Sequence, residues 1–155
     1  MSDAPRIPSG FSSVRALVDH LMVRDAYSRW LGVEVLEAEV GRSVLRMTVR
    51  EEMVNGFGTA HGGIVFSLAD SAFAFAINSA GTLSVAIDCT VNFPVAVRPG
   101  DVLTVEAHED SSTNRLAFCV ATVRNQRDET VAHFRGTGYR TTRPHVPDDL
   151  TPRTA

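Results

Sequence analysis

The stretch HGGIVFSLADSAFAFAINSAG, residues 61–81, decides how this chain folds. After its two glycines, apolar residues recur so often that they surround every side of a helix. A helix that is apolar on all sides is a buried helix. We therefore predict one long buried helix over residues 62–80, with Gly81 as its C-terminal cap.

The segments on either side of this helix have the alternating apolar pattern of β-strands. Upstream, two short runs flank a turn at Gly41 and Arg42, which predicts a β-hairpin. Downstream, longer runs are separated by turn residues, which predicts further antiparallel strands. The predicted strands cover residues 30–40, 44–49, 83–93, 101–108, 115–125 and 130–140.

This order of elements fits an α+β domain in which a curved antiparallel β-sheet wraps around one long buried helix, the hotdog fold. An additional N-terminal amphipathic helix is predicted over residues 11–30, with Ser12 or Ser13 as its cap. We expect a single domain over residues 11–142, with flexible tails at residues 1–10 and 143–155.

The composition is that of one globular domain, with 155 residues, 44% apolar residues and a net charge of −3. The negative charge argues against a dedicated nucleic-acid binder, which needs a basic face. No apolar run reaches the ~20 residues of a membrane span, and the N-terminus lacks the apolar core of a signal peptide. We expect a cytoplasmic protein in which Cys89 and Cys119 are buried free thiols.

The sequence lacks the motifs that are typical of metal sites and of nucleotide cofactor sites. The five histidines show no metal-ligand spacing, and the two cysteines form no CxxC pair. Neither a dinucleotide fingerprint nor a Walker sequence is present, and no serine lies in a Gly-x-Ser-x-Gly elbow. We expect no metal and no cofactor.

The start of the buried helix is suited to binding a substrate carbonyl. Gly62 and Gly63 occupy its first turn, where backbone N–H groups have no partner within the helix. These groups lie at the positive end of the helix dipole, and glycine lets a ligand approach the backbone closely. The sequence therefore predicts an oxyanion hole at this helix end.

Asp70 is the one charged residue of the buried helix. No basic residue lies three or four positions away to pair with its carboxylate. A desolvated, unpaired carboxylate has a raised pKa and suits a general base or a nucleophile. The alternative is an aspartate on a locally exposed helix face, or one bonded to a neighbouring loop.

The spacing of Gly62 and Asp70 limits how the two could act together. Eight residues along a helix axis correspond to roughly 12 Å. One substrate carbonyl cannot contact both groups of the same helix. If both act, the site combines Gly62 of one chain with Asp70 of a second chain, which predicts an obligate dimer.

Several segments of the chain resemble the PaaI-type thioesterases of phenylacetic acid degradation. The similar segments are MVNG (residues 53–56), HGG (61–63), FSLADSAFA (66–74), CTVNF (89–93), RPGD (98–101) and FRG (134–136). The resemblance covers about residues 50–140. It implies hydrolysis of a coenzyme A thioester, with aryl-acetyl or hydroxylated aryl-CoA as the favoured substrate. It also implies a homotetramer built from two dimers.

The resemblance assigns roles residue by residue. Asp70 is expected to act as general base or nucleophile, and the Gly62 N–H to bind the thioester oxygen. Asn55 is expected to place the attacking water or the thioester, although it could be merely a turn former. Some relatives carry a hydroxyl on the next strand, where this chain has Ala86, with Ser84 two residues earlier; a hydroxyl role there is in doubt.

Further residues are candidates for contacts with the substrate. We expect His61, Gly63, Phe73 and Arg98 to bind it, although His61 could instead shape the loop by bonding a backbone carbonyl. The phenylalanines at 57, 73, 75 and 93 could line an aryl pocket or fill the core. Arginines suit the phosphates of coenzyme A, and the candidates are Arg98, Arg135 and Arg140.

Two other functions compete with thioester hydrolysis. A hotdog hydratase or dehydratase would act on a hydroxyacyl-CoA, but its His-Phe-Pro type of segment is missing here. A non-catalytic acyl-CoA-binding module would need the fold and a phosphate site but not Asp70. Thiol release from acyl-CoA esters distinguishes a thioesterase from both.

Overall fold

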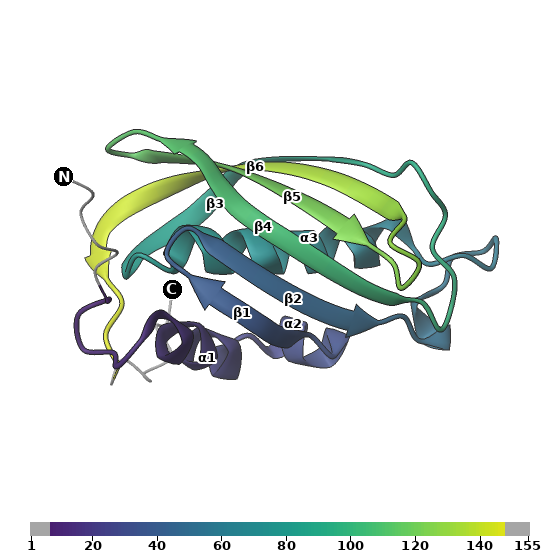
Figure 1. The fold of residues 1–155 in the computed structure, drawn as a ribbon, viewed down its shortest axis with the longest axis horizontal. Helices are drawn as coiled ribbons and strands as arrows, with labels where there is room; N and C mark the ends of the chain where they lie inside the picture. Colours follow the sequence, from purple (N-terminus) through teal and green to yellow (C-terminus); the bar gives the residue numbers. More distant parts are fainter. Residues whose placement is uncertain (1–6, 148–155) are drawn as a thin grey trace.

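The computed structural model describes residues 7–147. Two helices open the chain, and a hairpin, a long helix and four further strands follow (Figure 1). The elements are α1 (Val14–Arg24), α2 (Ala26–Leu31), β1 (Glu34–Glu39), β2 (Arg42–Thr48), the 3-10 turn η1 (Glu51–Met53), α3 (Gly62–Asn78), β3 (Thr82–Asn92), β4 (Val102–Ser112), β5 (Leu116–Arg124) and β6 (Thr130–Pro144).

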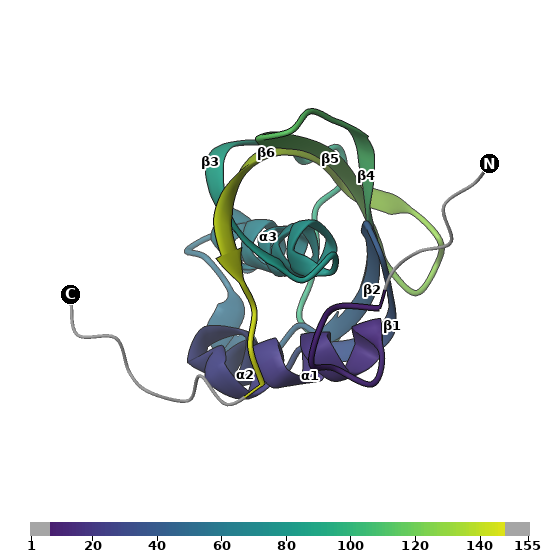
Figure 2. The same cartoon turned by 90° about the vertical axis from the view of Figure 1, so that its left-hand side faces the viewer.

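The strands form one antiparallel sheet in the order β1-β2-β4-β5-β6-β3. The sheet curves around α3, and α1 and α2 lie on the side of α3 that the sheet leaves open (Figure 2). The hotdog architecture predicted from the sequence is therefore confirmed. Since β3 closes one end of the strand order, its outer side has no partner strand within residues 7–147.

Helix α3 and strand β6 approach each other closely because β6 has glycines at the points of contact. A Cβ atom at Gly138 would lie 2.5 Å from Cδ1 of Ile77, and one at Gly136 would lie 2.9 Å from the Phe73 ring. Phe73 is fully buried and packs against the Phe134 ring of β6, with 5.6 Å between ring centroids. These contacts fix the face that α3 turns toward the sheet.

The predicted helix over residues 11–30 is interrupted at Asp25, so its continuity was a wrong prediction. The Asp25 carboxylate caps α2 by accepting hydrogen bonds from the Ser28 N–H and hydroxyl groups, and Ser13 caps α1. Ser28 is buried and its hydroxyl bonds that of Ser71 at 2.7 Å. The break therefore lets the short helix α2 dock directly on α3.

The elements also end at other residues than the sequence predicts. Helix α3 ends at Asn78 rather than residue 80, and Gly81 lies in the turn beyond it with φ +88°. Strand β6 continues to Pro144, past the predicted domain boundary at residue 142, and the His145 N–H donates to the Gly81 carbonyl. Of the tails predicted at residues 1–10 and 143–155, residues 1–6 and 148–155 lie outside the described residues.

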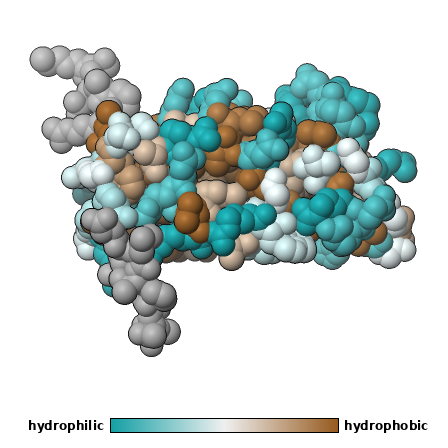
Figure 3. Space-filling view, turned by 90° about the horizontal axis from the view of Figure 1, so that it is seen from below, coloured by the Kyte–Doolittle hydropathy of each residue, from teal (hydrophilic) through white to brown (hydrophobic). Residues whose placement is uncertain are grey.

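The surface seen from below combines apolar and polar patches (Figure 3). Helices α1 and α2 lie on this side in Figure 1 and expose Val23, Tyr27 and Trp30, each by more than half. None of the helices in residues 7–147 has the length and apolar character to cross a membrane.

Candidate active site

At the N-terminus of α3, one backbone N–H group has no partner in the part of the chain that the structure describes. His61 caps the helix, and its Nδ1 accepts a hydrogen bond from the Gly63 N–H at 2.9 Å. The Ile64 N–H donates to the His61 carbonyl. The Gly62 N–H has no acceptor among residues 7–147. Of the two glycines expected to form an oxyanion hole, only Gly62 therefore has its N–H group free.

The cap also settles the orientation of His61. Its ring nitrogen accepts from an N–H group, whereas the sequence analysis offered a bond to a backbone carbonyl. The ring fixes the first turn of α3 because Nδ1 satisfies one of the unpaired donors there. In this position His61 and Gly63 hold the helix end beside Gly62.

An apolar hollow lies next to Gly62. Its volume is about 270 Å³, and it opens between the start of α3 and the loop that follows β3. The ring of Phe93 lies 3.4 Å from the point that a Cβ atom of Gly62 would occupy. The lining residues are Thr59, Ala60, Gly62, Val65, Phe93, Val95, Ala96 and Val97. An acyl or thioester group could enter this hollow and reach the Gly62 backbone.

Asp70 lies two turns further along α3 and is half-buried. Burial raises the pKa of its carboxyl group, the Cys89 thiol lowers it, and the negative charge of Asp25 raises it again. The net shift is upward from the ordinary value. No cationic side chain pairs with Asp70 within the described chain. A carboxylate with a raised pKa and a nearly empty hydrogen-bond shell is a competent proton acceptor.

Asn55 organises the loop that leads into α3. Its Oδ1 accepts from the Phe57 N–H at 2.8 Å and its Nδ2 donates to the Thr59 hydroxyl at 3.1 Å. Its backbone N–H also donates to the Thr59 carbonyl. Phe57, at the tip of this loop, is 92% exposed. The structure thus gives Asn55 the turn-forming contacts that the sequence analysis considered.

The remaining predicted substrate residues occupy different surroundings. Phe73 has no exposed surface and belongs to the core, so we leave it out of the site. Arg140 is already bonded to Glu109 and to the Thr113 carbonyl. The side chains of Arg98 and Arg135 form no ion pair or hydrogen bond within residues 7–147, which leaves them available.

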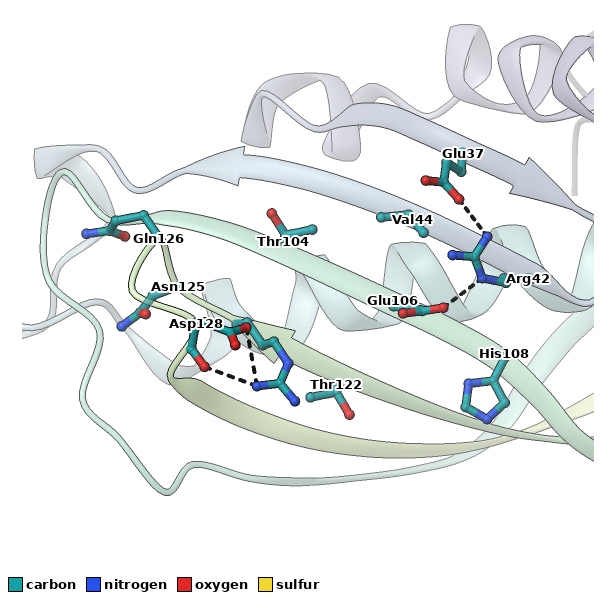
Figure 4. Close-up of a pocket in the computed structure, with 11 residues that line it drawn as sticks. Glu37, Arg42, Val44, Thr104, Glu106, His108, Thr122, Asn125, Gln126 and Asp128 are labelled. Carbon is teal, nitrogen blue, oxygen red and sulfur yellow. Dashed lines mark hydrogen bonds and ion pairs between the residues drawn. The ribbon is translucent and has the colours of Figure 1, made fainter.

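A larger hollow lies elsewhere, on the outer face of the sheet (Figure 4). Its volume is about 670 Å³. Arg42 in this hollow pairs with Glu37 and Glu106, and Arg124 with Asp128. The sheet separates it from α3, which lies behind the strands in Figure 4. Its three carboxylates outnumber its two arginines, so the hollow offers no excess positive charge to a phosphate, and neither Gly62 nor Asp70 lines it.

No group of three or more His, Cys, Asp or Glu side chains is arranged to hold a metal ion among residues 7–147. Both cysteines are free.

One residue at the site was missed by the sequence analysis. Cys89, predicted only as a buried thiol, lies with its Sγ 3.8 Å from Oδ1 of Asp70. The hydroxyl of Ser84, by contrast, bonds the Thr82 carbonyl rather than Asp70. The alternating pattern of this strand gave no signal of the Cys89 contact, because it depends on a bulge described below.

Comparisons with known proteins point to one family. The thioesterase superfamily model matches residues 57–132, which include Gly62 and Asp70. The acyl-coenzyme A thioesterase PaaI of Escherichia coli K12 is 40% identical over 116 residues, 75% of this chain and 83% of that protein.

Solved structures show the same similarity. The E. coli PaaI protein, from the phenylacetic acid degradation operon, has a TM-score of 0.79 and 37% identity, covering 83% of this chain and 94% of that one. A hypothetical thioesterase protein of Streptococcus pneumoniae TIGR4, crystallised with coenzyme A, has a TM-score of 0.75 and 25% identity. That match covers 84% of this chain and all of the other.

Proposed function

The chain belongs to the PaaI-type acyl-CoA thioesterases of the thioesterase superfamily, and we propose that Asp70, Gly62 and Asn55 form its active site. The reaction is hydrolysis of an acyl-CoA thioester to a free acid and coenzyme A. The observation that carries the assignment is the half-buried Asp70 carboxylate, which has a raised pKa and no cationic partner among residues 7–147.

In the proposed mechanism the thioester oxygen accepts a hydrogen bond from the Gly62 N–H. Asp70 takes a proton from a water molecule as that water attacks the thioester carbon, and the thiolate of coenzyme A leaves. Asn55 holds the loop beside Gly62 so that water and thioester meet there. In the other form of the mechanism Asp70 attacks directly and a mixed anhydride is then hydrolysed. Appearance of ¹⁸O from labelled water in Asp70 during a single turnover would establish the anhydride form, because water that attacks the Asp70 carbonyl of the anhydride leaves its oxygen there.

We propose that the active unit is a homodimer, which assembles further into a homotetramer. Gly62 and Asp70 are separated by roughly 12 Å along one helix, too far for one thioester. The free edge of β3 exposes Val85 by 45% and Ile87 by 59%, which is costly for an edge strand left unpaired. Antiparallel pairing of two β3 edges would continue the sheet and bring Gly62 of one chain toward Asp70 of the other.

The substrate proposed is an aryl-acetyl or hydroxylated aryl thioester of coenzyme A. The apolar hollow beside Gly62 supports this because Phe93 presents an aromatic ring to any group held there. Arg98 and Arg135 are the candidates for the coenzyme A phosphates, and the S. pneumoniae relative was crystallised with that ligand. The two free cysteines suit a cytoplasmic location.

Two inactive variants test the shared site. Gly62→Pro removes the N–H and little else, because proline is tolerated at the first position of a helix and His61 has the extended backbone that precedes proline. Asp70→Asn removes the base. Each variant alone is expected to be inactive. A heterodimer purified through two different tags keeps one intact site and should recover about half of the wild-type activity.

The matched control is Gly62→Ala, which keeps the N–H and adds a Cβ in ordinary contact with Phe93. It should retain most of the activity. An inactive heterodimer of two folded chains would contradict a site shared between subunits. Full activity of Gly62→Pro would remove Gly62 from the site.

A further inference from the structure

The thiol of Cys89 reaches Asp70 from the sheet. Its Sγ lies 3.8 Å from Oδ1, within the range of a hydrogen bond that involves sulfur. Among residues 7–147 no other side chain forms a hydrogen bond with this carboxylate. Cys89 therefore contacts the proposed catalytic group from a different element of the fold, strand β3.

The pairing of β3 with β6 explains why the thiol points toward the helix. Cys89 lies directly opposite Gly136. Directly opposite residues of an antiparallel pair lie on the same face. Gly136 faces α3, since a Cβ atom there would lie 2.9 Å from the Phe73 ring. Cys89 is thus on the face of the sheet that covers α3.

A bulge in β3 decides which residue occupies this position. The register passes from Ala86 opposite Gly138 to Asp88 opposite Thr137, which leaves Ile87 as the extra residue. If the strands paired without this bulge, Asp88 rather than Cys89 would lie opposite Gly136 and would face α3. A second carboxylate would then repel the charge of Asp70. The bulge therefore places a thiol against Asp70 and leaves Asp88 exposed on the other face.

We propose that Cys89 is the positioning residue of Asp70: its S–H group holds Oδ1 and thereby orients Oδ2 toward the attacking water. The inference rests on the proposed role of Asp70 as the base. A thiol is a weak donor. It fixes the direction of the carboxylate without stabilising the anion as strongly as the charge-assisted bond from a hydroxyl would.

The charges around the pair agree with this role. The pKa of Cys89 is raised to about 11, chiefly by burial and also by the charge and hydrogen bond of Asp70 and the charge of Asp88. The thiol is therefore protonated at neutral pH, a donor and a poor nucleophile. The other charged group acting on the pair is Asp25, which raises the pKa of Asp70.

Two substitutions at Cys89 separate positioning from packing. Cys89→Ser introduces a stronger donor of similar shape, which stabilises the Asp70 anion. The acidic limb of the pH profile of kcat/KM should move down by about half a pH unit or more. Cys89→Ala removes the donor, so the limb should move up while kcat falls roughly 3- to 10-fold with KM little changed. Shifts in the same direction, or none, would overturn the proposal.

Cys119→Ser is the matched control. Cys119, on β5, also lies opposite Gly136, and among residues 7–147 its thiol hydrogen-bonds the Val120 carbonyl rather than Asp70. The same substitution there should leave the acidic limb unchanged, even if the protein becomes less stable. An equal shift in Cys119→Ser would show that any core thiol has this effect, and would overturn the proposal.

The hydrogen bond of the Cys89 thiol can also be measured by infrared spectroscopy, which does not depend on activity. The Cys119→Ser protein is used because Cys89 is then its only thiol. The infrared S–H stretching band of Cys89 should shift toward the frequency of a weaker hydrogen bond when Asp70→Asn is added. An unchanged band would mean that the thiol does not bond Asp70. If Asp70→Asn alone is fully active, the proposed function fails. If Asp70→Asn is inactive, as expected, but the infrared band does not respond to it and the Cys89 variants keep the wild-type acidic limb, only the role of Cys89 fails.

Discussion

Asp70 is half-buried and Asp101 is buried, yet their carboxyl pKa values shift in opposite directions because their hydrogen-bond partners differ. Asp101 lies just before β4 and is only 4% exposed. It accepts from the Arg98 N–H at 2.8 Å and from Nε2 of Gln126 at 2.7 Å, and it pairs with Arg127 at 3.5 Å. Within residues 7–147, the carboxylate of Asp70 has one hydrogen-bond partner, the Cys89 thiol at 3.8 Å.

The two pKa shifts follow from these partners. Burial alone would raise the pKa of Asp101, but the Arg98 N–H, Gln126 and Arg127 lower it below its ordinary value. At Asp70 burial prevails and the pKa is raised. Burial by itself therefore does not identify a catalytic carboxylate. Asp70 differs from Asp101 because, among residues 7–147, its carboxylate has a weak thiol donor, whereas that of Asp101 has a backbone N–H, an amide and a guanidinium.

The largest expected effect is on catalysis at Asp70. Asp70→Asn should lower kcat/KM for an aryl-acetyl-CoA by about 10³-fold or more, because it replaces the proposed base with an amide that does not accept the proton. Its free energy of unfolding in urea should equal or slightly exceed that of the wild type, since a costly buried charge is removed. Release of free coenzyme A thiol measures the first quantity. Wild-type turnover in a folded Asp70→Asn protein would contradict the catalytic role proposed for Asp70.

The same substitution at Asp101 should act on stability. Asp101→Asn places an amide donor where the Arg98 N–H and Gln126 also donate, and should cost about 1–3 kcal/mol of unfolding free energy. The kcat/KM of the folded fraction should change by less than about threefold. Asp128→Asn is the matched control because its side chain is 87% exposed, so its effect should stay within about 0.5 kcal/mol. A stable Asp101→Asn protein would mean that these bonds contribute little.

Much of this contrast was within reach of the sequence. The apolar stretch around Asp70 predicted a buried helix, and the missing basic residue nearby predicted an unpaired carboxylate with a raised pKa. The alternating strands predicted the curved sheet. These inferences succeeded because they depend on local periodicity, which a buried helix and a β-strand both express directly in their residue order.

The features that sequence reasoning missed depend on contacts between distant segments. The apolar residues at 85, 87, 89 and 91 alternate without interruption, so nothing in them marks the bulge at Ile87. The bulge arises from pairing with β6, and it alone decides that Cys89 faces Asp70. Two of the three donors to Asp101, the side chains of Gln126 and Arg127, come from a turn about 25 residues later in the chain. Such partners become visible only when the strands are paired.

The smallest expected effect is the dependence of unfolding free energy on pH. It is also the most direct test of the difference between Asp70 and Asp101, because their pKa shifts have opposite signs. Asp101 has a lowered pKa in the fold, so its contribution is present above the unfolded pKa and is lost as pH falls through the folded value. Wild-type protein should therefore lose more stability than Asp101→Asn on acidification below pH ~4.

Asp70 should show the reverse sign. Its pKa is raised in the fold, so the folded state binds more protons than the unfolded state, and stability falls as pH rises through the interval between the two pKa values. Any stability advantage of Asp70→Asn should therefore exist at neutral pH and disappear on acidification. Urea unfolding of both variants at a series of pH values measures the two difference curves. Curves of the same sign would mean that the two carboxylates are bound alike, and the distinction between a structural and a catalytic aspartate would lose its physical basis.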